Sequence, residues 1–368
     1  MILNGKYVTD SEIANLSQFV QTELQYQEAE IYKIEYPELT YDKVIPVNSA
    51  ASGVQQIAYD VYDRAGEAQL ITSYSKDVPR ATTGKIRKYR GIYEYGQGAA
   101  YTIQEVNSAR FANLPLETRE LEAARYGTEI RMNKLAYFGD KNISEDDFYG
   151  LFNNGQVGVL VNNVSDEFPV VTLKDGTTPA TWEEALSETG ATADDLASAA
   201  QRISQQINYV FAKINNRSLG VEVADTLLIP RLQYNLIATT VISTFTQETV
   251  LSRVIKNSPY LKSESDIIVV NELSYANAQK AADNNTSPFG TAATRTDVTG
   301  ATISNANLQQ DAMMALRRDP HKLKFWMATP FNFLQPQLVN FEFRINGYCS
   351  TGGHIMYYPL SALMAFGI

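Results

Sequence analysis

Alternating apolar and polar residues predict a long β-hairpin over residues 49–101. Ile57, Tyr59 and Val61 are separated by single residues, which is the period of a half-buried strand. Residues 63–66 (Asp-Arg-Ala-Gly) are predicted to form its turn. The return strand is basic and interleaved with aromatic residues; its cations are Lys76, Arg80, Lys85, Arg87, Lys88 and Arg90.

This basic limb has three interpretations from its residues alone. Basic strands with aromatic residues can bind nucleic acid. Charged strands can also serve as solvated edges that resist association. A third possibility is that the limb meets an acidic segment of another copy, because complementary charges set register and encounter rate.

Apolar residues at helical spacing predict two long helices. In residues 115–138 the stripe consists of Leu121, Ala124, Thr128, Met132 and Leu135. Pro115 suits the first position of this helix, and Gly139 ends it. Thr192 caps the second helix, whose apolar face holds Leu196, Ala199, Ile203, Ile207, Phe211 and Ile214.

The rest of the chain predicts a mixed α/β domain over residues 156–335. Short strands are expected at 226–229 and 266–270, and a helix is expected at 234–242. Residues 312–327 are predicted to be a strand pair that turns at Asp319-Pro320, and a loop is expected over 281–309. Two final strands, 341–349 and 355–358, flank a predicted turn at Gly352-Gly353.

The first 48 residues are acidic and contain too few apolar residues for a core of their own. A short helix after Ser11 is expected within them. The acidic side chains include Glu28, Glu30, Glu35 and Glu38. We predict that residues 1–48 form an arm.

Composition narrows the function classes. The 368 residues carry a net charge of −10, which argues against a dedicated nucleic-acid binder. No apolar stretch is long enough to cross a membrane, and the N-terminus lacks a secretion-signal pattern. The chain has 22 tyrosines, a residue enriched at subunit interfaces.

Few residues are available for catalysis or metal binding. There is one cysteine, Cys349, and there are two histidines, His321 and His354. A triad using His354 lacks a Gly-x-Ser-x-Gly elbow, so both histidines are expected to be structural. Acidic residues cluster without the spacing of a calcium loop at Asp140, Glu145, Asp146 and Asp147. We therefore expect no enzyme, no metal and no cofactor.

Four stretches resemble the HK97-fold major capsid proteins of tailed phages, and most closely their encapsulin-like branch. Residues 57–60 and 77–79 resemble the extended loop. Residues 116–138, followed by Gly139-Asp140 and by Gly-Leu-Phe-Asn at 150–153, resemble the spine helix and its Gly-Leu-Leu-Asn turn, with Phe152 replacing the usual leucine. Residues 227–230 followed by Tyr234 resemble the axial-domain strand and helix. Residues 318–331 and 352–359 resemble the end of the axial domain and the last peripheral strands.

The resemblance implies an α+β, HK97-like capsid fold with five parts. These are an N-terminal arm (1–48), an extended β-hairpin loop (49–101), a peripheral domain with a long spine helix (102–155), an α/β axial domain (156–335) and C-terminal strands that return to the peripheral domain (336–368).

The implied function is that of a major capsid protein. Copies would assemble in the cytoplasm of a bacterial host into pentamers and hexamers, which tile an icosahedral shell around the double-stranded DNA genome of a virion. The partners are other copies and a portal, with a separate scaffold and decoration proteins as further candidates; no membrane is involved. Our hypothesis is that the basic hairpin residues contact acidic residues of adjacent copies, with Glu28, Glu30, Glu35, Glu38, Glu145, Asp146 and Asp147 as candidates.

Other functions remain open at this point. An encapsulin-like compartment would hold protein cargo, although residues 160–190 and 281–309 exceed the usual encapsulin length and favour a virus shell. A hydrolase would lose activity on His354→Ala. A DNA-binding module would bind through the basic hairpin with steep salt dependence.

Overall fold

The computed structural model of the chain describes residues 2–3, 6–7, 35–68, 80–111, 116–143, 148–162, 168–242, 247–283, 285–291, 295, 297–298 and 303–368. The chain forms two compact units, Met1–Glu38 and Leu39–Ile368. In the first unit, β1 (Ile2–Leu3) pairs with β2 (Lys6–Tyr7) in antiparallel fashion. The helix expected after Ser11 lies outside the described residues.

The second unit begins ten residues before the predicted end of the arm. In this stretch α2 (Tyr41–Val44) buries Val44, and Ile45 is fully buried as well. The Thr40 hydroxyl lies 2.8 Å from the Tyr137 hydroxyl, and β3 (Val47–Ser49) runs parallel to a strand of the main body. Burial and strand pairing therefore place residues 39–48 in the body and not in an arm.

Within the described residues, one five-stranded sheet lies between two apolar clusters. Its order is β7 (Gly158–Val161), β14 (Ala362–Phe366), β10 (Ala312–Leu316), β8 (Thr226–Ile229) and β9 (Ile267–Val269). Alternate residues face opposite sides, so Leu227 and Ile229 join one cluster and Leu228 the other. Strands that are buried on both faces of a sheet have nearly continuous apolar sequences, and the strands of this sheet do.

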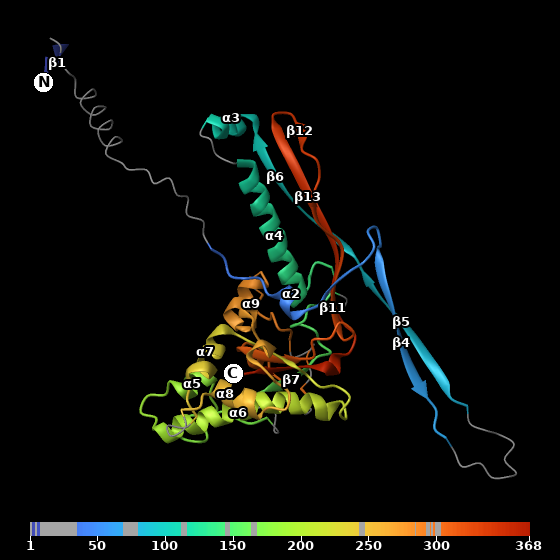
Figure 1. Ribbon diagram of the computed structural model, residues 1–368, viewed down its shortest axis with the longest axis vertical. Helices are drawn as coiled ribbons and strands as arrows, with labels where there is room; N and C mark the ends of the chain where they lie inside the picture. The colour runs from blue at the N-terminus through green and yellow to red at the C-terminus, as the bar shows by residue number, and fades with distance from the viewer. Residues whose placement is uncertain are drawn as a thin grey trace. The chain divides into compact units, whose positions relative to one another are not determined.

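Helices cover this first sheet. The longest, α6 (Ala193–Arg217), starts at Thr192 with a capping box and packs its apolar stripe on one face, as the sequence predicted. The lower end of α4 (Leu116–Phe138) lies on the other side (Figure 1). Shorter helices complete the two layers: α5 (Trp182–Leu186), α7 (Arg231–Thr239) and α8 (Val250–Asn257) lie on the side of α6, and α9 (Tyr275–Ala281) lies on the side of α4.

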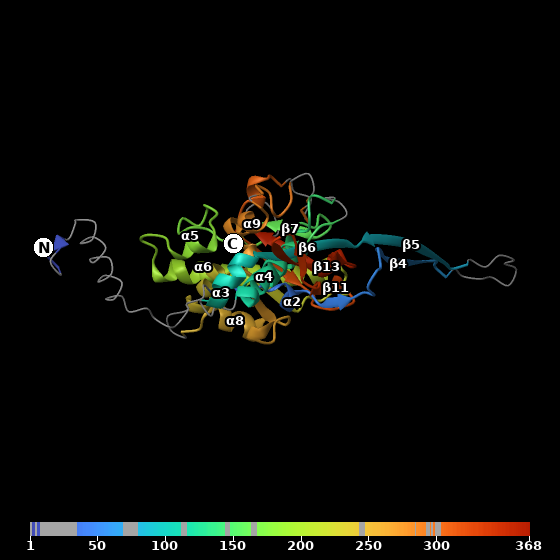
Figure 2. The same ribbon diagram turned by 90° about the horizontal axis from the view of Figure 1, so that it is seen from above.

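A second sheet carries the rest of the body. It has the order β12 (Gln337–Val339), β13 (Glu342–Met356), β11 (Leu323–Phe333) and β3, with β6 (Tyr93–Thr102) on the other side of β13. The helix α3 (Ile103–Phe111) follows β6, and α4 packs along β6 (Figures 1 and 2). The predicted stripe on α4 is confirmed from Ala124 to Leu135, although Leu121 is only half-buried and Pro115 lies outside the described residues.

The end of α4 explains the glycine-rich motif that follows it. Gly139 has φ +68°, a left-handed conformation that ends the helix as predicted. A side chain on Gly150 would lie 2.3 Å from the Phe138 nitrogen, so this position has room only for glycine. The Asn153 amide closes the turn by donating to the Phe138 carbonyl at 2.7 Å. Phe152 stacks on Tyr137 with ring centres 4.6 Å apart.

Two predictions about strand connection were wrong, and one strand was not predicted. β10 and β11 do not pair, because they belong to different sheets. Gly352-Gly353 is not a turn; β13 runs through it, and the register shift beside Trp326 accommodates the extra residue as a bulge. β14 does not join β13 but inserts between β7 and β10, so the last strands serve both sheets.

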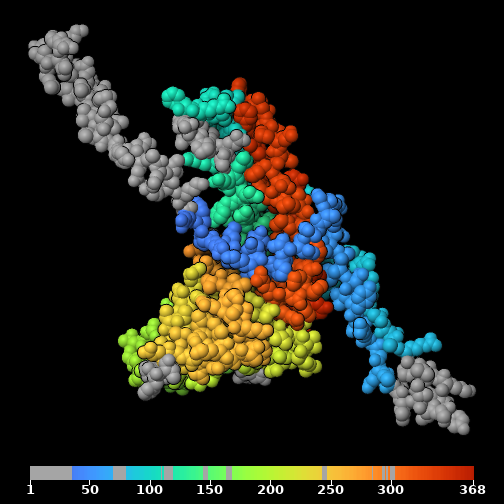
Figure 3. Space-filling model, viewed as in Figure 1, coloured from blue at the N-terminus to red at the C-terminus, as the bar shows by residue number. Residues whose placement is uncertain are grey.

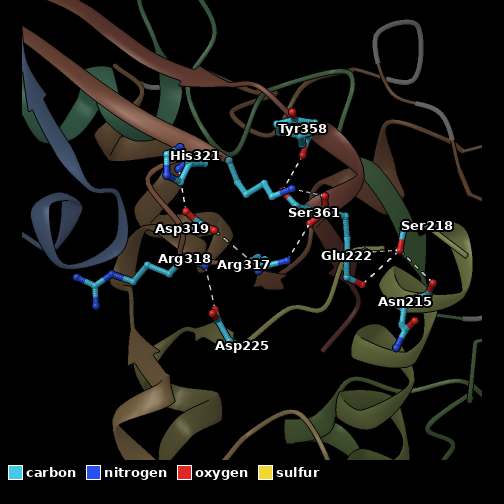
Figure 4. A network of polar contacts seen from close by, with 11 residues as sticks. Asn215, Ser218, Glu222, Asp225, Arg317, Arg318, Asp319, His321, Tyr358 and Ser361 are labelled. Atoms are coloured by element: carbon cyan, nitrogen blue, oxygen red, sulfur yellow. Dashed lines mark hydrogen bonds and ion pairs between the residues drawn. The ribbon is translucent and has the colours of Figure 1, made fainter. Parts of the chain in front are cut away.

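The chain crosses between the two sheets twice at one place. Residues 317–322 connect β10 to β11, and residues 357–361 connect β13 to β14. Figure 4 shows polar contacts that join these connectors to the segment after α6. At their centre, the buried Glu222 carboxylate lies 2.5 Å from the Lys322 amine and 3.6 Å from the Arg317 guanidinium.

Candidate functional site

The predicted hairpin is present and consists of β4 (Gln56–Ala65) and β5 (Thr82–Gly91). Its pairing runs from Gln56 opposite Gly91 to Ala65 opposite Thr82. The predicted turn at 63–66 was wrong, because residues 63–65 are still paired strand residues. The paired strands extend away from the two sheets (Figures 1 and 3).

Arg90 fixes the base of the hairpin to the body. Its guanidinium donates to the carbonyls of Gly352 at 3.2 Å, Tyr149 at 3.2 Å and His354 at 3.1 Å. It also lies 4.7 Å from the centre of the Phe148 ring. Only 7% of Arg90 is exposed, which corrects its predicted role as an inter-subunit contact: at this end of β5 the side chain faces the body of its own chain.

The other strand is fixed by aromatic packing. The Tyr59 ring meets the Tyr357 ring edge-on, with centres 4.9 Å apart. The Tyr357 hydroxyl accepts a hydrogen bond from the Trp326 indole at 2.9 Å. Burial raises the pKa of both tyrosines above its ordinary value, so their hydroxyls stay protonated. Both strands are therefore held where they leave the body.

Lys85 and Arg87 find an acidic partner inside the hairpin. The Asp60 carboxylate lies 2.7 Å from the Lys85 amine and accepts hydrogen bonds from Arg87 at 2.7 and 3.2 Å. The hydrogen bonds from Arg87 and Lys85 hold the Asp60 pKa well below its usual range. Sequence reasoning missed Asp60 because its role depends on the strand register, which places it directly opposite Arg87.

The other candidate contacts have different outcomes. Arg80 and Lys88 are exposed on the hairpin, and Glu35 and Glu38 are exposed in the first unit. Their contact with another copy stays a prediction. The remaining candidates, Lys76, Glu28, Glu30, Glu145, Asp146 and Asp147, lie outside the described residues.

The residues considered for chemistry lie in different environments where they are described. His354 is fully buried beneath Arg90, and neither ring nitrogen has a hydrogen-bond partner in the described part of the chain. Burial, with a smaller contribution from the Arg90 charge, lowers its pKa to about 3, so the ring is neutral at neutral pH. Asp140 accepts hydrogen bonds from Arg131 and Tyr95. Cys349 is buried and unpaired.

Among the described residues, no group of three or more histidine, cysteine and acidic side chains lies close enough to hold a metal ion. The described helices include none with the length and apolar character needed to cross a membrane.

Comparisons with known proteins agree with the geometry. The sequence profile of the family described as major capsid protein matches residues 66–368. The chain is similar to the capsid of Myoviridae phage XM1, at 15% identity and a TM-score of 0.67, over 94% of this chain and 98% of that chain. It is also similar to the capsid of cyanophage P-SCSP1u, at 12% identity and a TM-score of 0.53, over 99% and 96% of the two chains. No curated protein matches. The predicted HK97-like α+β capsid fold is confirmed.

Proposed function

The chain belongs to the major capsid protein family; from this premise we propose that its copies form pentamers and hexamers that close the icosahedral shell of a phage virion around double-stranded DNA. In this arrangement the first sheet and its helices are the axial domain and point to the centre of each capsomer. The second sheet and α4 are the peripheral domain. A portal, a separate scaffold and decoration proteins complete the set of proposed partners, and the role is structural and not catalytic.

The hairpin is the observation that carries this proposal. A two-stranded hairpin is marginally stable in water without a further layer or strand. Here the strand residues from Val61 to Ala65, and from Thr82 to Tyr89, are exposed although their base is anchored by Arg90. An anchored hairpin with bare faces fits a protein whose next copy supplies the missing contacts.

Charge supports the same arrangement. Because Asp60 neutralises part of the hairpin charge, Arg80 and Lys88 become the exposed cations best placed to meet another copy. Their proposed partners are the acidic residues of the arm and of the 145–147 segment, which the sequence identified. Such pairs steer encounter and register, so they should make assembly depend on salt.

The proposal is tested by producing the chain alone and together with its candidate scaffold. Light scattering and negative-stain microscopy should show closed, isometric particles in the megadalton range under at least one condition. A species of 40.9 kDa under both conditions would contradict it. In particles, Lys88→Glu should lower the yield more than Lys256→Glu, which reverses an exposed cation on α8.

A further inference from the structure

A cleft lies at the base of the hairpin, between its two strands and the body of the same chain. Its volume is about 270 Å³. The hairpin contributes Tyr59, Lys88 and Arg90 to the lining, and the body contributes Tyr149 and Gln156. Drug-sized ligands occupy pockets of about 300–1,000 Å³, so this volume suits a smaller molecule or ion.

The lining of the cleft is positively charged. It includes the cations Lys88 and Arg90, and no carboxylate of the described residues lines it. Asp60 is next to Tyr59 on the strand and therefore points to the opposite face, where two other cations already hold its carboxylate. His354, which lies beneath Arg90, is neutral at neutral pH. The charge of the cleft therefore favours an anion.

The cleft also offers hydrogen-bond donors. Within the described part of the chain, the Lys88 amine and the Gln156 side-chain amide bond no other group, and both side chains are exposed. Burial raises the pKa of Tyr59, so its hydroxyl stays protonated and can donate. Amine, amide and hydroxyl donors together match an oxyanion that has several acceptor oxygens, and hydrogen bonds between charged groups are the strong ones.

We propose that this cleft binds a phosphate group, with the Lys88 amine, the Gln156 amide and the Tyr59 hydroxyl donating to its oxygens. The bound group links the hairpin to the body and adds to the anchor that Arg90 already forms. Free phosphate or pyrophosphate presents this chemistry, and so does the backbone of DNA; the experiment below separates the two sources. The site goes beyond the proposed shell function and does not depend on it.

Calorimetric titration of the full chain with sodium pyrophosphate tests the site. The chain is used before assembly, when Lys88 meets no other copy, without divalent ions and at an ionic strength held constant with sodium chloride. Pyrophosphate should bind at one site per chain. Lys88→Gln should weaken binding at least ~10-fold, and Gln156→Ala about 3-fold, because each removes a donor. Lys256→Gln is the control; it removes an exposed cation on α8, outside the cleft, and should bind like the unmodified chain.

Hydrogen exchange gives a second measurement. Bound pyrophosphate should slow amide exchange in residues 56–60 and 87–91, which form the hairpin base, and should leave β9 unchanged. Exchange that does not change at the hairpin base would overturn the proposed link, even where calorimetry shows binding.

A short DNA duplex separates the two sources of the phosphate group. Displacement of pyrophosphate by the duplex would identify the group as part of DNA, and binding of pyrophosphate that the duplex leaves unchanged would identify a free oxyanion. Both results support a phosphate site. Equal affinities of Lys88→Gln and Lys256→Gln for pyrophosphate, or no binding of pyrophosphate and duplex by the unmodified chain, would overturn it.

Discussion

At the scale of single residues, the hairpin shows how one buried cation can be structural while its neighbours are exposed. Arg90 and Arg87 lie on the same strand, yet Arg90 donates to backbone carbonyls of the body and Arg87 pairs with Asp60 at the surface. Composition identified both as basic residues of one limb. The strand register, and the distance of each residue from the body, decide that Arg90 is an anchor and that Arg87 is a solvated charge.

His354 carries a prediction about pH. Its pKa is about 3 in the folded chain and 6.5 in the unfolded reference, so between these values the unfolded state binds more protons. Stability from this group is therefore complete above about pH 6.5 and falls as the pH decreases, with a slope of about 1.4 kcal/mol per pH unit. Denaturant unfolding at pH 7, 6, 5 and 4 should give a flatter profile for His354→Gln. Parallel profiles for the two proteins would contradict the assignment.

At the scale of elements, the turn after α4 shows what a short motif encodes. The Gly-Leu-Phe-Asn sequence forms a tight turn against the end of α4, because Gly150 lies against the helix backbone and the Asn153 amide donates to the Phe138 carbonyl. The Phe152 departure from the family pattern is accommodated by stacking on Tyr137. Motif, helix end and apolar cluster form one packed unit.

Gly150→Ala should disrupt this unit. The added Cβ atom would lie 2.3 Å from the Phe138 nitrogen, so the backbone has to move, at a cost of about 3 kcal/mol. Thermal unfolding should show a clear loss of stability. Gly84→Ala is the control, because a Cβ atom there meets nothing within 4 Å. Equal unfolding midpoints for the two variants would be inconsistent with the packing described.

Elements were easier to predict than their partners. The long helices follow from local spacing and a cap at Thr192, and the strand at 226–229 follows from a short apolar run before Pro230. Strand pairing depends on residues far apart in sequence, so the separation of β10 from β11 and the place of β14 were missed. The hairpin turn was placed too early because Gly66 looked like a turn residue, while pairing continues to Ala65. Asp60 was missed for the same reason: its partners are defined by register.

At the scale of the whole second unit, two connectors cross between the sheets side by side, residues 317–322 and 357–361. Charged side chains meet where they cross. Glu222 holds the connector residues Arg317 and Lys322, and Lys322 also covers the Tyr358 ring at 4.0 Å. Because both connectors meet here, the two sheets share a single electrostatic junction (Figure 4).

Glu222→Gln should destabilise both sheets together. Removing the carboxylate leaves Lys322 largely buried without its counter-charge, which costs about 3–5 kcal/mol. Hydrogen exchange should accelerate in β10 and in β11 to a similar degree. Glu248→Gln is the control, since its partner Lys256 is exposed and such pairs contribute about 0–1 kcal/mol. Acceleration confined to one sheet would show that the junction does not couple them.

The position of β14 has a consequence for the order of events during synthesis. Gly158 of β7 pairs with Leu363, and Met313 of β10 pairs with Ala365, so the strand that joins β7 to β10 is translated after the other strands of this sheet. Until residues 362–366 have left the ribosome, the first sheet lacks its second strand, and its two apolar faces cannot close. The first sheet of a nascent chain is therefore incomplete until this strand has been made.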